Sequence, residues 1–274
     1  MKEFDFINNL LRPIAGSNSA NLQDDCAHFY GYVITKDILA AGVHFFEDDE
    51  PFNLARKALR VNLSDLASCG AQPFGFMLGL ALPKNTSQEW LEKFTSGLQA
   101  DITKYNIQLL GGDTIKHNAP LIISITALGK AEKPIKRAGA KVGDSIFVSG
   151  NIGDGYIGLK EKSGKYLLPE PRIDLGLKLH GTATACVDIS DGLLADLNHI
   201  LVASNVGAEI YSAQIPVSSN RYNLMDLITG GDDYELCFTA PVEEFAGCTK
   251  IGKITSSNGI KLDGKIVEPK GYVH

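Results

Sequence analysis

Several features that assign proteins to common classes are missing from this sequence of 274 residues. No apolar run approaches the length of about 18 residues that a membrane-spanning helix needs, and the opening "MKEFDFINNLL" is typical of an amphipathic helix rather than a signal peptide. No run of five basic residues occurs, and the net charge is −6. We therefore expect neither a membrane partner nor a nucleic-acid partner, and an anionic substrate would need metal cations.

Cysteine usage argues against two further classes. The chain has five cysteines, an odd number, and no CxxC pair. A disulfide framework and a structural zinc site are both disfavoured by this pattern. Reduced thiols and a cytoplasmic location are expected.

Common catalytic motifs are missing too. The sequence has no GxxxxGK[ST] phosphate-binding loop, no GxSxG nucleophile turn and no kinase-type catalytic loop. One stretch, "GDGYIG" at 153–158, matches the GxGxxG pattern of dinucleotide sites. A long loop separates it from the preceding strand, so we favour a structural turn between a strand and a helix.

Hydrophobic periodicity predicts alternating strands and helices, that is, an α/β (α+β) chain. Strands are predicted at 30–36, 107–114 (buried, ending in glycines), 121–129, 145–150 and 185–189, helices at 53–69, 87–104 and 191–204, and a loop at 163–174. The chain becomes polar near 131–144. This change predicts two domains, 1–134 and 135–274.

The two halves also repeat short motifs. "VNLSD" (61–65) and then "GGDT" (111–114) are matched in order by "VDISD" (187–191) and "GGDD" (230–233). Common architecture of the halves and chance are both open explanations.

Aspartates at the ends of predicted elements, beside small or apolar residues, are the most informative feature. There are nine of them: Asp24, Asp25, Asp37, Asp65, Asp113, Asp188, Asp191, Asp232 and Asp233. Any one alone would be read as a helix cap or turn residue. Carboxylates gathered together repel one another, and bound cations with oxygen ligands would stabilise them. Oxygen ligands suit Mg²⁺, Mn²⁺ or Ca²⁺, and carboxylates together with glycine turns indicate phosphoryl chemistry.

The stretch "CVDISDGLLADL" (186–197) predicts how three of the acidic residues are used. Asp188 lies at a strand end and Asp191 at a helix start, so both are expected to face a cleft. Asp196 is expected on the exposed polar face of the helix. Among the histidines, His44 is a candidate substrate contact, and the others are expected to be surface or turn residues.

Together these motifs resemble thiamine-monophosphate kinase, within the aminoimidazole ribonucleotide synthetase-like superfamily. The resemblance runs through nearly the whole chain, in "DDCA", "TKDILAAGVHF", "NLSDLASCGAQP", "GGDT", "RAGAKVGD", "VDISDGLLADLNHI", "GGDDYELCF" and "KGYVH". It implies a two-domain synthetase-like fold and a homodimer in which the N-terminal sheets form a β-barrel. It also implies direct, Mg²⁺-dependent transfer of the γ-phosphoryl group of ATP to thiamine monophosphate, giving thiamine diphosphate and ADP.

Matching positions carry the family's site residues over to this chain. The expected metal ligands are Asp25, Thr35, Lys36, Asp37, Asp65, Asp113, Asp188 and Asp191, of which Asp65 and Asp191 are expected to be catalytic. The expected ATP contacts are Tyr105, Gly112, Arg137 and Ser190. The expected contacts to thiamine monophosphate are His44, Asp232 and Tyr272, with Asp232 facing the cationic part.

Two positions depart from the family pattern. Gln23 stands where a glycine is common, and Lys36 stands where a small polar residue is common. If that position coordinates metal through its carbonyl, lysine is harmless; if through a hydroxyl, a metal site is weakened or the ammonium replaces a cation. Two alternatives stay open: another ATP-driven chemistry of the superfamily, such as ribonucleotide ring closure, and a binding protein that has lost catalysis.

Overall fold

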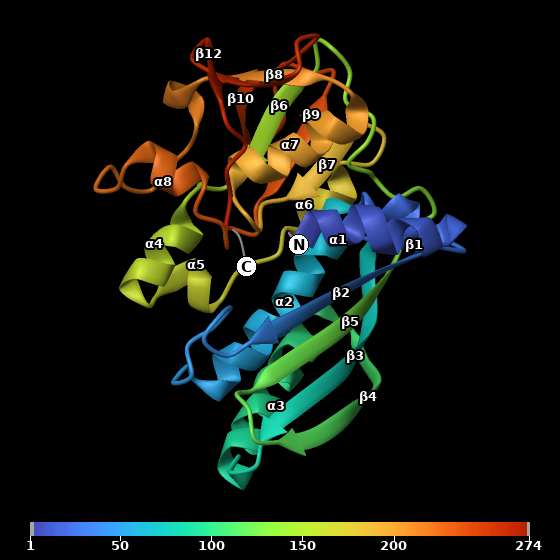
Figure 1. The fold of residues 1–274 in the computed structure, drawn as a ribbon, viewed down its shortest axis with the longest axis vertical. Helices are drawn as coiled ribbons and strands as arrows, with labels where there is room; N and C mark the ends of the chain where they lie inside the picture. Colours follow the sequence, from blue (N-terminus) through green and yellow to red (C-terminus); the bar gives the residue numbers. More distant parts are fainter. Residues whose placement is uncertain (1–2, 273–274) are drawn as a thin grey trace.

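The computed structural model describes residues 3–272 and has a mixed α/β fold in two halves, stacked along the long axis in Figure 1. The first half contains a five-stranded sheet in the order β1-β2-β5-β3-β4. Its strands are β1 (Ala27–Phe29), β2 (Tyr32–Ala40), β3 (Gln72–Pro83), β4 (Gln108–His117) and β5 (Ile122–Lys130). Neighbouring strands are antiparallel except for β3 and β4, which run parallel.

Two long helices cover one face of this sheet. Helix α2 (Pro51–Ser68) packs on β2, β5 and β3, and α3 (Gln88–Tyr105) packs on α2. The Oγ of Ser87 accepts a hydrogen bond from the N–H of Trp90 at 3.1 Å, which begins α3 as the sequence predicted. Helix α2 is buried along most of its length, so it forms the centre of the molecule (Figure 1).

The other face of the sheet is open in the single chain. Strand β4 is an edge strand whose residues are exposed, apart from the half-buried His117. The prediction of a buried strand at 107–114 is therefore right about the strand and wrong about its burial. The apolar residues of "IQLLGG" indicate a strand that is stabilised by burial. A sequence pattern does not distinguish burial within one chain from burial against a second chain.

The second half contains a seven-stranded sheet in the order β12-β11-β8-β10-β6-β9-β7. Its strands are β6 (Ser145–Ser149), β7 (Ala185–Asp188), β8 (Gly207–Ile210), β9 (Leu236–Ala240), β10 (Cys248–Thr255), β11 (Gly259–Leu262) and β12 (Lys265–Val267). The helices are α4 (Asp154–Glu161), α5 (Gly164–Leu167), α6 (Ile173–Lys178), α7 (Leu193–Ser204), α8 (Leu224–Ile228) and the short η4 (Ser212–Gln214). Helix α7 ends at Ser204, as predicted, and is followed by Asn205 in a left-handed conformation.

The remaining described elements precede the first sheet. They are α1 (Glu3–Phe6), η1 (Ile7–Leu11), η2 (Arg12–Ile14) and η3 (Ser17–Leu22). Between residues 3 and 272, no helix is both long and apolar enough to span a bilayer.

Three local expectations can be compared with these elements. The segment 163–174 contains α5 and the start of α6, so it is not simply a loop. The repeated motifs fall on different elements, because "VNLSD" lies inside α2 whereas "VDISD" ends β7 and turns into α7. "GDGYIG" starts α4, and the buried carboxylate of Asp233 accepts the N–H groups of Gly153 and Gly155 at 2.7 and 2.8 Å. That helix start is occupied by the chain itself, as expected for a structural turn.

Candidate functional site

Three carboxylates from distant parts of the chain meet where the two halves join. Asp25 precedes β1, Asp65 lies in the last turns of α2 and Asp188 ends β7. One carboxylate oxygen from each lies within 4.8 Å of the others. The Oγ of Ser64 donates to Asp188 Oδ2 at 2.6 Å, and Thr35 Oγ1 donates to Asp65. We call Asp25, Asp65 and Asp188 the carboxylate cluster.

Burial and mutual repulsion disfavour the charged forms of these groups. The pKa of Asp188 is raised to about 8 by desolvation and by the charge of Asp25. The pKa of Asp65 is raised by desolvation and by Asp37, Asp188 and Asp25, and that of neighbouring Asp37 is raised to about 6. Such a cluster is stable in its ionised form when a cation lies between its oxygens. The donor set therefore fits a hard divalent cation such as Mg²⁺.

The turn between β7 and α7 is held by Asp196. One of its carboxylate oxygens accepts the backbone N–H groups of Ser190, Asp191 and Gly192, at 3.0, 3.1 and 3.0 Å. Asp196 is 2% exposed, so the prediction that it lies on an exposed helix face is wrong. The turn leaves three N–H groups without backbone partners, and a carboxylate one turn into α7 satisfies all three.

A cavity of about 290 Å³ opens beside the cluster, between the two halves. Its lining includes eight of the predicted site residues: Asp37, His44, Asp65, Asp188, Ser190, Asp191, Asp232 and Tyr272. Asp232 has φ of 58°, its N–H donates to the carbonyl of Ser190 at 2.8 Å, and Tyr234 donates to its carboxylate at 3.1 Å. The N–H of Tyr272 donates to the carbonyl of Asp191 at 2.9 Å, which fixes the C-terminal segment at the site.

Two more predicted residues contact the cluster directly. Thr35 reaches Asp65, as described above. Arg137 Nε donates to Asp25 Oδ1 at 2.8 Å, and its backbone N–H donates to Asp24 Oδ1 at 2.8 Å. Arg137 therefore links the start of the second half to the loop that carries Asp25.

Lys36 points away from the cluster. Successive residues of a strand face opposite sides of the sheet, and Asp37 is on the side of α2. The Lys36 ammonium lies on the open face, where it donates to Ser124 Oγ at 2.7 Å and to Thr126 Oγ1 at 3.3 Å. The backbone of Lys36 lies next to Asp37, whereas its ammonium group does not.

The three predicted residues near β4 lie apart from the cavity. Asp113 pairs with Gly79, which pairs with Ser124, which pairs with Ile38. Asp113 is therefore three strands from β2, about 14 Å at the usual strand spacing. Gly112 is its neighbour on β4, and Tyr105 ends α3, where its hydroxyl lies 3.2 Å from Glu170 Oε1.

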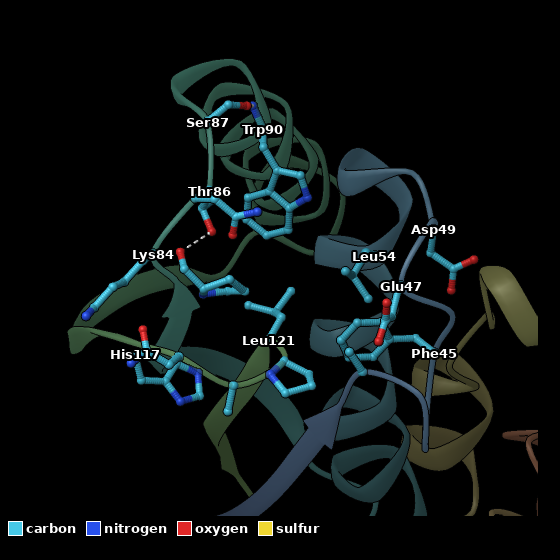
Figure 2. A pocket seen from close by; sticks show the side chains of 16 residues that line it. Phe45, Glu47, Asp49, Leu54, Lys84, Thr86, Ser87, Trp90, His117 and Leu121 are labelled. Carbon is cyan, nitrogen blue, oxygen red and sulfur yellow. Dashed lines mark hydrogen bonds between the residues drawn. The ribbon is translucent and has the colours of Figure 1, made fainter.

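A larger cavity, of about 680 Å³, lies at the far end of the first sheet (Figure 2). Phe45, Leu54, Trp90 and Leu121 form its apolar part, and its rim carries the exposed side chains of Glu47 and Lys84. None of the predicted site residues lines it. Size alone does not identify the site, because the smaller cavity is the one lined by Asp65 and Asp188 of the carboxylate cluster.

The chain matches known families over both halves. Residues 23–131 match the AIR synthase related protein N-terminal domain, and residues 141–265 match the corresponding C-terminal domain. The thiamine-monophosphate kinase of Caulobacter vibrioides is 38% identical, over 98% of this chain and 85% of its own length. That of Haemophilus influenzae is 38% identical, over 94% of this chain and 91% of its own length.

The chain belongs to the thiamine-monophosphate kinase family. A solved structure of AaThiL complexed with AMPPCP and TMP is 32% identical and superimposes with a TM-score of 0.92, over 100% of this chain and 97% of that one. The thiamine monophosphate kinase structure from Aquifex aeolicus is 31% identical with a TM-score of 0.89, over 97% of this chain and 98% of that one.

In this member of the thiamine-monophosphate kinase family, sequence reasoning missed two residues at the site and misplaced a third. Lys57 and Tyr166 line the cavity of about 290 Å³ beside the carboxylate cluster, which we call the central cavity, and neither was predicted. A lysine among the apolar positions of α2 was the available signal for Lys57. His199, expected at the surface, is half-buried on α7, and burial and the charge of Arg137 lower its pKa to about 4.

Proposed function

We propose that this protein transfers the γ-phosphoryl group of ATP to thiamine monophosphate, giving thiamine diphosphate and ADP. The carboxylate cluster carries the proposal, because it opens directly onto a cavity large enough for a small organic phosphate. Family membership and a similar structure that binds an ATP analogue together with TMP support the same reaction.

The cluster residues would hold Mg²⁺ in this reaction, together with Asp37 and Asp191. Mg²⁺ held there would supply positive charge that offsets the repulsion between the two phosphates. The protein supplies the orientation: Thr35 and Ser64 fix the carboxylates of Asp65 and Asp188. The acceptor phosphate is already ionised at neutral pH, so direct transfer needs no strong general base.

The proposed substrate end of the cavity contains His44, Asp232 and Tyr272. The carboxylate of Asp232 would face the cationic part of thiamine, and the hydrogen bond from Tyr234 holds it in place. The proposed ATP contacts are Arg137, beside Asp25, and Ser190, in the turn held by Asp196.

We also propose a homodimer in which the two N-terminal sheets close into a barrel. Strand β4 offers an unpaired edge, and the open face exposes Ile38, Met77 and Ile115 at 55%, 48% and 56%. Within one chain the sheet separates Asp113 from the carboxylate cluster. A second copy packed on the open face would bring Tyr105, Gly112 and Asp113 to a shared nucleotide site.

The domain assignment follows the same proposal. Residues 1–134 would supply most ATP and metal contacts, and residues 135–274 would close the cavity with metal and substrate residues. The cavity lining drawn from both halves supports this division.

A direct assay tests the proposed function. Purified protein with ATP, Mg²⁺ and thiamine monophosphate should produce thiamine diphosphate and ADP in equal amounts, quantified by chromatography. Chelating Mg²⁺ with EDTA should stop the reaction. ADP formation only with a ribonucleotide substrate would favour another chemistry of the superfamily. Tight calorimetric binding of both ligands without any product would favour a protein that binds but does not catalyse.

A further inference from the structure

Lys57 is a buried cation in the central cavity with no assigned role. Its side chain is 1% exposed on α2, and among the described residues that line the cavity it is the only lysine or arginine. Burying an ammonium group costs free energy unless partners compensate for the lost water. The groups that Lys57 contacts therefore indicate the role of its buried ammonium.

Two side chains from different halves of the protein meet at one carbonyl oxygen. Lys57 Nζ donates to the carbonyl of His44 at 2.9 Å, and the Tyr166 hydroxyl on α5 donates to the same oxygen at 3.3 Å. The ammonium also lies 3.6 Å from the centre of the Tyr166 ring, a cation–π contact. Lys57 and Tyr166 thus support each other and hold the His44 peptide between them.

The imidazole of His44 is fixed from its other side. Its Nδ1 accepts the backbone N–H of Ala40 at 3.0 Å, and the backbone N–H of His44 donates to the carbonyl of Ala40 at 3.0 Å. Because Nδ1 accepts a hydrogen bond from a backbone N–H, the ring N–H of this tautomer is on Nε2. His44 is therefore a hydrogen-bond donor whose peptide is anchored at both ends.

The position of Lys57 along α2 argues against contact with the reacting phosphates. Asp65 follows it by eight residues, which is about 12 Å along a helix. Lys57 lies at the end of the cavity that His44, Tyr166 and Asp232 share, where burial lowers its pKa and the charge of Asp232 opposes that shift. Its charge acts on the part of the pocket far from the carboxylate cluster.

We propose that Lys57 is a positioning residue for the acceptor substrate, which with Tyr166 holds the His44 carbonyl so that the imidazole donor faces the organic part of that substrate. This inference rests on the proposed kinase function and names a residue that it does not include. It assigns the buried charge to recognition of the acceptor, and not to phosphoryl transfer.

The test compares steady-state kinetics of Lys57→Met, Tyr166→Phe and His44→Ala. Lys57→Met keeps the length of the side chain and removes its charge and donors. We expect it to raise the KM for thiamine monophosphate about tenfold, as for loss of a charge-assisted hydrogen bond, with the KM for ATP within about twofold. Tyr166→Phe should raise the same KM by a smaller factor.

Combined variants separate positioning from general packing. In a His44→Ala background the imidazole is gone, so Lys57→Met should change the KM for thiamine monophosphate by less than about twofold. The inference would be overturned if the effects of Lys57→Met and His44→Ala on the KM for thiamine monophosphate multiply in the double variant. It would also be overturned if Lys57→Met raises the KM for ATP as much as the KM for thiamine monophosphate. If Lys57→Met does not fold, Tyr166→Phe with His44→Ala provides the same comparison.

Lys162→Met is the matched control. The Lys162 ammonium contacts the loop that follows His44 from the solvent side, 3.7 Å from Asp48 and 4.3 Å from the centre of the Phe46 ring. Lys162→Met should leave both KM values unchanged, and a rise equal to that of Lys57→Met would count against the proposal. A wild-type protein without thiamine diphosphate production would contradict the proposed function itself, whereas an active wild type with independent effects contradicts only the role of Lys57.

Discussion

The carboxylate of Asp196 accepts the backbone N–H of Asp191 at 3.1 Å, although the two side chains have different tasks. Asp191 lines the cavity, whereas Asp196 is buried behind it and also holds Ser190 and Gly192. The turn that brings Asp191 to the cavity is therefore held by a second acidic residue, which does not line the cavity.

Asp196→Ala should destabilise the protein by about 3 kcal/mol, because three buried N–H groups lose their acceptor. Asp196→Asn should cost less, since the amide oxygen still accepts. Urea unfolding at pH 7 gives the free energy of unfolding. Asn198→Ala on the same helix is the control and should stay within about 0.5 kcal/mol of wild type. A similarly small change for Asp196→Ala would show that the turn is held by other contacts.

Asp101 on α3 should also be important for stability, because it is the partner of a buried arginine on α2. Arg60, 2% exposed, donates to it through Nε at 2.7 Å and Nη2 at 2.9 Å. Asp101→Ala leaves a buried guanidinium without that partner, which typically costs about 3–5 kcal/mol. Thermal and urea unfolding measure the loss. The exposed pair Glu89–Lys93 is the comparison, and Glu89→Ala should leave the free energy of unfolding close to that of wild type.

Asp65→Asn should reduce kcat at least about 100-fold while the fold is retained, because Asp65 belongs to the proposed metal site. The neutral amide also removes a repulsive charge from the cluster. The melting temperature in EDTA should therefore equal or exceed that of wild type. Asp226→Asn, at an exposed position of α8, should change neither quantity. Full activity of Asp65→Asn would remove that residue from the site.

Metal-free protein should lose stability as the pH rises from about 4 to about 8. The pKa of Asp188 is about 8 when folded, against an ordinary value of 3.8, and that of Asp37 is about 6. In this range the folded chain binds more protons than the unfolded chain, so the free energy of unfolding falls with pH. Mg²⁺ should restore more stability at pH 8 than at pH 5.5, measured by urea unfolding with and without EDTA. Equal stabilisation at both pH values would contradict the assignment of the cation to these carboxylates.

Ile115→Lys should convert the proposed dimer to monomer and lower kinase activity with it. The substitution places a charge on the open face of the first sheet, beside Asp113 on β4. Sedimentation velocity measures the oligomeric state. Ile266→Lys on β12, 79% exposed in the second half, is the control and should leave the oligomeric state unchanged. A wild-type protein that sediments as a monomer while fully active would contradict the shared site.

Local signals predicted those elements whose ends are determined by neighbours in sequence. Helix α3 has its cap at Ser87, and α7 ends at Ser204, before Asn205. Both depend on residues within one turn, which a sequence displays directly. The strand β7 and the placement of Asp188 at its end were predictable for the same reason, because a short apolar run followed by a turn is itself a local pattern.

Burial was predicted less well, because it depends on what packs against an element. Asp196 was expected to be exposed since it falls off the apolar stripe of α7, yet the preceding turn folds back onto it. The apolar β4 was expected to be buried, and none of residues 3–272 of the single chain covers it. Lys57 was overlooked because a lysine on a helix is usually solvated, whereas α2 is surrounded by both halves.

The sequence by itself determined the chemistry: aspartates beside small residues at the ends of elements, a family resemblance along the chain, and the order of strands and helices. Only the tertiary structure decided which aspartates meet. It gathers Asp25, Asp65 and Asp188 within 4.8 Å, assigns Asp196 to the backbone, and leaves Asp113 three strands away. The physical reason is that charge and periodicity are properties of a segment, whereas distance, desolvation and repulsion arise only when segments from both halves pack together.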